Sequence, residues 1–294
     1  MLKNGYIRRT TAASPAPRLS QTRARLQLDG GTWRQAFSNS MRLIALPAFQ
    51  DNYIWALQTP DDRTIFVDPG QAGPVFEAAA QGMQPAGVLL THHHDDHIGG
   101  VAELRQRWPR LRVLAPQDER IALECERVSE GNRVELSGFD FTVMEVPGHT
   151  RSHIAYYGHD HLFSGDMLFS LGCGRMFEGT PAQMLASLRR MAALPPQTLV
   201  CCGHEYTLAN AVFARHVDPT NAALQRRQQE ASDMRSSSRP TVPAVLASEL
   251  ECNPFLRTAD TAIVAAITAR LGRAPTDEVE VFAELRRWKD GFRA

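Results

Sequence analysis

Positions 91–100 constrain this chain more than any other segment, because they read Thr-His-His-His-Asp-Asp-His-Ile-Gly-Gly. Neutral imidazole and carboxylate oxygen are ligands that bind zinc, iron and manganese in proteins. Three imidazoles and one carboxylate within six positions are difficult to explain as packing. We therefore interpret four side chains of this segment as metal ligands: His92, His94, Asp96 and His97.

Three further candidate ligands follow other predicted strands, each beside a glycine: His149, Asp166 and His204. Loops at strand ends are where enzymes commonly place chemistry. We expect His93 to point away from its neighbours, into the core or toward a supporting contact, because alternate residues of an extended segment face opposite ways. Asp68 is either a hydrogen-bond acceptor behind a ligand imidazole or a turn residue. The remaining histidines are interpreted as structural: His153, His159, His161 and His216.

Seven ligands are too many for one tetrahedral ion and suit two ions that share a carboxylate. Such a pair can hold a bridging hydroxide at neutral pH and can polarise a carbonyl, which favours hydrolysis of an ester, thioester, amide or phosphodiester. A purely structural site would favour cysteine ligands. The sequence has neither a GxSxG nucleophile motif nor a P-loop, so it gives little support to a serine hydrolase or an NTPase.

The order of predicted elements indicates an α+β chain. Short β-rich runs occur between residues 41 and 202, and helical patterns are interleaved with them at 74–82, 97–108, 117–124 and 181–193. After residue 206 the pattern is helical, near 207–217, 219–235, 258–271 and 276–290, with a Ser/Pro-rich connector at 236–254. We therefore predict a mixed domain at 41–206 and a helical domain at 207–294.

Residues 1–40 differ from the rest, with seven Lys or Arg and one acidic residue. They are either a leader-like segment or a disordered extension before a true start at Met41, and we favour the extension. The mildly acidic remainder argues against nucleic acid as a partner. No apolar stretch is long enough to span a membrane. Five cysteines without a CxxC pair suit reduced thiols, so we expect a cytoplasmic protein.

The segment THHHDDHIGG resembles the THxHxDH signature of the metallo-β-lactamase superfamily, which implies a four-layer αββα sandwich. Narrower marks are similar to the glyoxalase II (hydroxyacylglutathione hydrolase) family. They are PAFQDNYIW (47–55), GDMLFSLGCGRMFEGT (165–180), GHEYT (203–207), NPFLR (253–257) and LRRWKDGF (285–292). This similarity extends from about Met41 to Phe292.

The family resemblance implies a role for each candidate residue. One metal would be held by His92, His94 and His149. The other would be held by Asp96, His97 and His204, with Asp166 bridging. The catalytic hydroxide would be held by both ions beside Asp166, Asp96 and His97. The glutathione part of a substrate would contact Arg175, Phe177, Tyr206, Arg286 and Lys289. Some family members have Lys and Tyr in place of Arg175 and Phe177, so this chain keeps the cation and loses one hydroxyl.

The expected activity is hydrolysis of S-(2-hydroxyacyl)glutathione, above all S-D-lactoylglutathione, to glutathione and D-lactate, the second step of methylglyoxal disposal. We expect two divalent ions, zinc first with iron or manganese as alternatives, and a monomer that binds neither nucleic acid nor membranes. Two other readings stay open. One is a mononuclear-iron glutathione persulfide dioxygenase, and the other is a different metallohydrolase of the superfamily, such as a nuclease or a lactonase.

Overall fold

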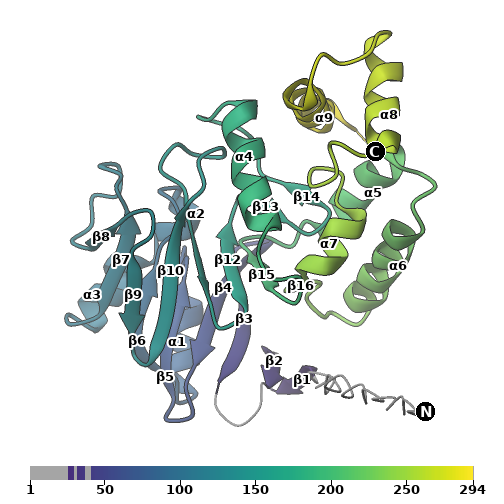
Figure 1. Cartoon of the computed structure of the whole chain (residues 1–294). Coiled ribbons are helices and arrows are strands. Elements are labelled where there is room, and N and C mark those ends of the chain that lie inside the picture. Colours follow the sequence, from purple (N-terminus) through teal and green to yellow (C-terminus); the bar gives the residue numbers. More distant parts are fainter. Residues whose placement is uncertain (1–25, 30–31, 37–40, 294) are drawn as a thin grey trace, which may run out of the picture.

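The computed structural model describes residues 26–29, 32–36 and 41–293 of the 294-residue chain. Two β-sheets lie face to face, helices cover their outer faces, and a group of helices follows at the C-terminal end (Figure 1). This arrangement confirms the predicted α+β class and the αββα layering. Among the described residues, no helix is both long and apolar enough to cross a membrane.

The first sheet has eight strands in chain order, antiparallel from β1 to β5 and parallel from β5 to β8. Its strands are β1 (Leu26–Asp29), β2 (Thr32–Ala36), β3 (Arg42–Ala48), β4 (Asn52–Gln58), β5 (Arg63–Val67), β6 (Gln84–Leu89), β7 (Arg112–Pro116) and β8 (Glu126–Val128).

The second sheet has six strands, all antiparallel to their neighbours except the parallel pair β12–β15. In spatial order they are β16 (Ala244–Val245), β15 (Leu199–Cys202), β12 (His161–Gly165), β11 (Ile154–Gly158), β10 (Phe139–Glu145) and β9 (Arg133–Leu136). A separate hairpin is formed by β13 (Leu168–Phe169) and β14 (Gly172–Cys173).

Nine helices lie within the described residues. Those between residues 41 and 206 are α1 (Gly73–Ala80), α2 (Asp95–Ile98), α3 (Val101–Arg107) and α4 (Pro181–Ala192). Those of the C-terminal part are α5 (Thr207–Val217), α6 (Ala222–Ser236), α7 (Leu246–Cys252), α8 (Thr261–Leu271) and α9 (Glu278–Gly291). Side-chain caps begin several of them; for example, Thr180 and Gln183 form a reciprocal capping box at α4.

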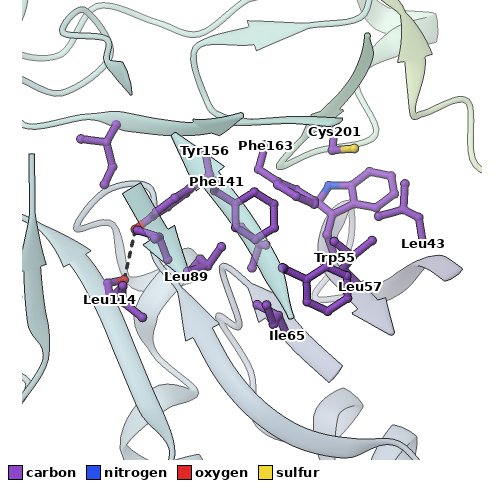
Figure 2. Close-up of a cluster of buried hydrophobic side chains, with 14 of the residues drawn as sticks. Leu43, Trp55, Leu57, Ile65, Leu89, Leu114, Phe141, Tyr156, Phe163 and Cys201 are labelled. Carbon is purple, nitrogen blue, oxygen red and sulfur yellow. Dashed lines mark hydrogen bonds between the residues drawn. The ribbon is translucent and has the colours of Figure 1, made fainter. Parts of the chain in front are cut away.

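Strands β3 and β4 read as continuous apolar runs because both of their faces are buried. On β3, Leu43 belongs to the core between the sheets, whereas Ile44 belongs to the core under α1 and α3. Figure 2 shows the inter-sheet core, where aromatic side chains such as Phe141 and Tyr156 lie among aliphatic ones. Trp55 donates a hydrogen bond from Nε1 to the carbonyl of Cys202 at 2.9 Å and so links the two sheets.

Three predictions of local structure need correction. The predicted helix at 97–108 is two helices, α2 and α3, separated at the tightly packed Gly99 and Gly100. No helix forms at 117–124, because the Asp118 carboxylate accepts the backbone N–H and the guanidinium of Arg120 and stabilises a turn. The connector at 236–254 contains β16 and α7, so a strand occurs after residue 206.

Strands β1 and β2 lie within residues 1–40, the segment predicted to be a disordered or leader-like extension. Strand β2 pairs with both β1 and β3, so β1 lies at the edge of the first sheet. The other residues of that prediction, 1–25, 30–31 and 37–40, lie outside the described residues.

Candidate metal centre

The histidine-rich loop leaves the end of β6 and turns directly into α2. It fits closely against the loop that follows β5. A Cβ atom on Gly70 would lie 1.9 Å from the carbonyl oxygen of Asp96, and one on Gly100 would lie 2.4 Å from the carbonyl carbon of Gln71. Only glycine allows these backbone segments to approach so closely. The packing therefore fixes where the side chains of the loop point.

Three imidazoles meet on one side of the site. Nδ1 of His94 lies 3.0 Å from Nε2 of His92 and 3.1 Å from Nε2 of His149. His92 and His149 are buried, whereas His94 is partly exposed. Although His149 follows β10 in the second sheet and the others follow β6 in the first, all three offer nitrogen atoms to one point.

A second group of donors meets beside the first. The ligand atoms of Asp96, His97 and His204 lie within 4.8 Å of one another. Oδ2 of Asp96 is 3.6 Å from Nε2 of His97 and 3.4 Å from Nε2 of His204. His204 follows β15, so this group too joins the two sheets.

Asp166 lies between the two groups. Its Oδ2 is 3.6 Å from Nε2 of His149, in the first group, and 3.3 Å from Nε2 of His204, in the second. Its Oδ1 is 3.4 Å from Nε2 of His97. The structure therefore brings all seven sequence-predicted ligand residues together, with one carboxylate facing both groups.

Several side chains fix the ligands from behind. Asp68 accepts hydrogen bonds from the backbone N–H of Thr91 (2.8 Å), from the Thr91 hydroxyl (2.7 Å) and from Nδ1 of His97 (3.0 Å). Asp68 is therefore a hydrogen-bond acceptor behind a candidate ligand imidazole, the first of the two roles considered for it. Asp51 accepts from Nδ1 of His204 at 2.8 Å. These contacts leave Nε2 of His97 and Nε2 of His204 directed at the site.

Two neighbours of Asp96 and Asp166 were not identified from the sequence as part of the site. Asn52 donates to Oδ2 of Asp96 at 3.0 Å. His153 accepts the backbone N–H of Asp166 through Nε2 at 3.2 Å, and its ring stacks on His92 with centroids 4.7 Å apart. The interpretation of His153 as a structural histidine did not include these contacts, for which its position four residues after His149 is the available sequence signal.

The remaining histidines do not face the ligand groups. His93 turns toward Asp118 and Glu178, with nitrogen–oxygen distances of 3.5 and 3.7 Å, as its alternation predicted. His159 lies in the turn at the far end of the β11–β12 hairpin, and His216 packs against Trp288.

The electrostatics of the site suit cations. Burial alone would raise the pKa of Asp166, but His97 and His204 outweigh it and hold this pKa well below the usual range. Burial would lower the pKa of His97, but the carboxylates of Asp166 and Asp68 raise it well above the usual range. Nε2 of His97 and Oδ1 of Asp166 are buried without a hydrogen-bond partner. Buried nitrogen and oxygen atoms without hydrogen-bond partners in a His/Asp cluster are suited to bind metal ions.

A cavity of about 460 Å³ opens beside the ligand groups and shares His149 and Asp166 with them. It lies where the C-terminal helices meet the loop after β14. Its lining includes all five side chains that the sequence predicted for substrate contact: Arg175, Phe177, Tyr206, Arg286 and Lys289.

The cations of this cavity differ in their surroundings. Arg286 is almost fully buried, and it donates to the carbonyl of Cys173 at 2.7 Å and to Asp290 at 2.9 Å. Arg175 is mostly exposed. Burial, with the nearby charge of Arg286, lowers the pKa of Lys289 to about 8. The cavity therefore presents positive charge beside a cluster of metal ligands.

Comparisons with known proteins agree with this geometry. The model of the metallo-β-lactamase superfamily matches residues 49–204, and the model of the hydroxyacylglutathione hydrolase C-terminus matches residues 205–292. The hydroxyacylglutathione hydrolase of Xanthomonas axonopodis pv. citri (strain 306) is 66% identical over 255 residues, which cover 86% of this chain and 100% of the relative. The chain belongs to the hydroxyacylglutathione hydrolase family.

A second member of the hydroxyacylglutathione hydrolase family, from Xylella fastidiosa (strain M12), is 62% identical over 252 residues, which cover 86% of this chain and 98% of the relative. Among solved structures, the BLEG-1 B3 metallo-β-lactamase superposes with a TM-score of 0.55 at 24% identity, covering 74% of this chain and 99% of that one. This likeness shows the shared fold.

Proposed function

We propose that this enzyme hydrolyses S-(2-hydroxyacyl)glutathione, above all S-D-lactoylglutathione, to glutathione and D-lactate in methylglyoxal detoxification. The observation that carries the proposal is the shared boundary between the cationic cavity and the ligand groups. A glutathione thioester bears a carboxylate on each of its two terminal residues and an acyl carbonyl at its sulfur. A cavity that is lined by cations and borders the candidate metal ligands matches both parts.

We assign His92, His94 and His149 to one metal ion and Asp96, His97 and His204 to the other, with Asp166 bridging. The interatomic distances described above support this division, because each trio is compact and Asp166 faces both. When bound, divalent ions would polarise the thioester carbonyl and lower the pKa of a water molecule, which supplies the nucleophilic hydroxide. Zinc suits these ligands, and iron or manganese would also be accepted.

The residues of the chain then bind and orient the substrate. Arg175, Arg286 and Lys289 would pair with the glutathione carboxylates, and Tyr206 and Phe177 would line the path to the sulfur. Phe177 lies edge-on to His149, with ring centroids 5.2 Å apart, and Tyr206 stacks on His204 at 4.7 Å. These aromatic rings would exclude water from the reacting carbonyl. The thiolate of glutathione needs little protonation to leave, because thiols are fairly acidic.

The deciding experiment measures turnover and metal content together. Purified protein with its metal counted should hydrolyse a glutathione thioester faster than a lactone or a phosphodiester, and should not consume oxygen with glutathione persulfide. About two ions per chain are expected. One tightly bound iron with persulfide-dependent oxygen uptake would instead identify the dioxygenase.

The Asp166→Ala variant tests the bridging role in the same assay. It should lose metal and activity together, because a single carboxylate serves both ligand groups. Full metal occupancy in this variant would contradict the bridging assignment. Asp160→Ala is the matched control, since Asp160 lies in the turn at the opposite end of β12.

We further propose a two-domain organisation, with a catalytic domain at 41–206 and a glutathione-binding helical domain at 207–294, in a cytoplasmic monomer without nucleic acid or membrane partners. The cationic cavity lies against α5 and α9, which supports a glutathione-binding role for the helical domain. Light scattering of the purified protein would test the monomer, and a dimer mass would overturn it.

A further inference from the structure

Glu249 is a fully buried carboxylate in α7 that takes no part in the ligand groups. Its Oε1 accepts a hydrogen bond from the hydroxyl of Ser170 at 2.7 Å, and its Oε2 accepts from the backbone N–H of Leu171 at 2.7 Å. Both donors belong to the turn of the β13–β14 hairpin. A buried acidic side chain is costly unless its acceptor positions are filled, so these contacts are specific.

Asn253, at the C-terminal end of α7, bonds to the same hairpin. It is also fully buried, and Nδ2 lies 3.0 Å from the carbonyl oxygen of Phe169 and 3.0 Å from that of Gly172. The amide Nδ2 is also 3.1 Å from Oε2 of Glu249, which joins the two side chains. The backbone of the hairpin turn is therefore bonded on both its N–H and C=O groups by two residues of the C-terminal part.

The hairpin bonded by Glu249 and Asn253 connects the candidate metal centre to the cationic cavity. Asp166 lies immediately before it, and Arg175 comes immediately after Gly174. At its base, the N–H of Gly174 donates to the carbonyl of Met167 at 3.2 Å. A Cβ on Gly174 would lie 1.9 Å from the carbonyl oxygen of Asp166, so the two ends of the hairpin are in close contact. A displacement of the turn would reach the bridging carboxylate at one end and the cavity at the other.

We propose that Glu249 and Asn253 are positioning residues that set Asp166 against the metal ligands and Arg175 against the cavity. The C-terminal helical part thus serves the metal centre as well as the substrate. The part of this inference that concerns the substrate rests on the proposed function, whereas the part that concerns the metal does not.

Two variants test the proposal. Glu249→Gln keeps the size of the side chain but places an amide N–H against a donor of the hairpin or of Asn253. Asn253→Ala removes both bonds to the hairpin carbonyls. The matched control is Asp260→Ala, which removes the N-cap of α8 and whose side chain bonds Ala262 and Arg257 rather than the hairpin or α7.

Three measurements separate positioning from general stability: zinc affinity by chelator competition, kcat and KM for a glutathione thioester at saturating zinc, and amide exchange of residues 167–174 in the metal-free protein. The two hairpin variants should exchange faster there, bind zinc about tenfold more weakly and lose about tenfold in kcat/KM, as expected for a disturbed ligand support. Asp260→Ala should lower Tm while zinc affinity and kcat/KM stay at the wild-type values.

The proposal is overturned if a correctly folded hairpin variant binds zinc as tightly as the wild type, or if Asp260→Ala weakens zinc binding as much as the hairpin variants do. A failure of the proposed function has a different signature. In that case the wild-type protein would not hydrolyse a glutathione thioester, while the zinc affinities and exchange rates of the variants would still report on the hairpin.

Discussion

Nδ1 of His204 donates a hydrogen bond to Oδ1 of Asp51 over 2.8 Å. The acceptor lies in the turn between β3 and β4, and the donor follows β15, which pairs in parallel with β12 in the second sheet. The bond fixes the ring orientation of His204, and Nε2 is left to face Asp96 and Asp166. A carboxylate behind a ligand imidazole also raises its basicity and so strengthens metal binding.

Replacing this acceptor should weaken metal binding without removing a ligand. We expect Asp51→Ala to lower zinc affinity by about 10- to 100-fold, measured by competition with a chelator, and activity to return when excess zinc is added. Asp61→Ala is the control, because Asp61 is an exposed acid at the other end of β4. Unchanged zinc affinity in Asp51→Ala would show that the contact does not support the ligand.

The backbone of Gly203 lies against two of the candidate ligand side chains. A Cβ at this position would lie 2.6 Å from Oδ1 of Asp166 and 2.7 Å from Cε1 of His97. Gly203→Ala should therefore displace both side chains and leave the purified protein with less than its full metal content and roughly 100-fold lower kcat/KM, a loss of about 2.7 kcal/mol.

Gly73→Ala provides the comparison for this substitution. Nothing lies within 4 Å of a Cβ built on Gly73, at the start of α1, so metal content should be unchanged and stability equal or slightly higher. Equal metal content in both alanine variants would contradict the close approach at Gly203.

Lys289 should make substrate binding depend on pH. Burial, reinforced by Arg286, lowers the pKa of this amine to about 8, so the amine is charged below that pH and neutral above it. A neutral amine cannot pair with a glutathione carboxylate. KM for a glutathione thioester should therefore rise as pH increases through about 8, measured by initial rates corrected for spontaneous hydrolysis.

The Lys289→Arg variant isolates this titration. A guanidinium stays charged throughout the range, so the rise of KM near pH 8 should be absent. If the wild type and Lys289→Arg gave parallel KM profiles, Lys289 would not be the titrating group.

Phe177 is an exposed aromatic side chain in the cavity, at a position where some family members have Tyr. Phe177→Tyr should lower KM roughly three- to tenfold, because one added hydrogen bond to the glutathione backbone contributes about 1 kcal/mol. Phe49→Tyr is the matched control, since Phe49 is similarly exposed and does not line the cavity. An equal KM change in both variants would exclude a specific bond at residue 177.

The convergence of the seven candidate ligand side chains could be predicted from sequence, because their residue types are rare and their positions follow strands. His149, Asp166 and His204 each stand just after a strand of the second sheet, and strand ends were readable from apolar runs bounded by glycine. Long amphipathic helices such as α4 and α9 were predicted well, since their hydrophobic period and caps agree. The order of elements predicted a mixed domain followed by helices, whereas the αββα layering was implied by the resemblance of residues 91–100 to the metallo-β-lactamase signature.

The supporting contacts could not be predicted in the same way. Asp51 and His153 act through partners 153 and 13 positions away, and a single aspartate or histidine in a turn carries no sign of such a partner. The short helix α7 was hidden within a segment rich in Ser and Pro. The helix predicted at 117–124 failed because the Asp118 side chain bonds locally to Arg120, a competition that hydrophobic periodicity does not register.

The candidate ligands come from two separate layers of the sandwich: four of them lie in the segment that follows β6, and three lie after strands of the second sheet. Metal ions bound by ligands from both layers would cross-link the two sheets. Because ligands that bind only the folded state stabilise it by mass action, zinc supply would govern how long each molecule survives as well as how fast it turns over.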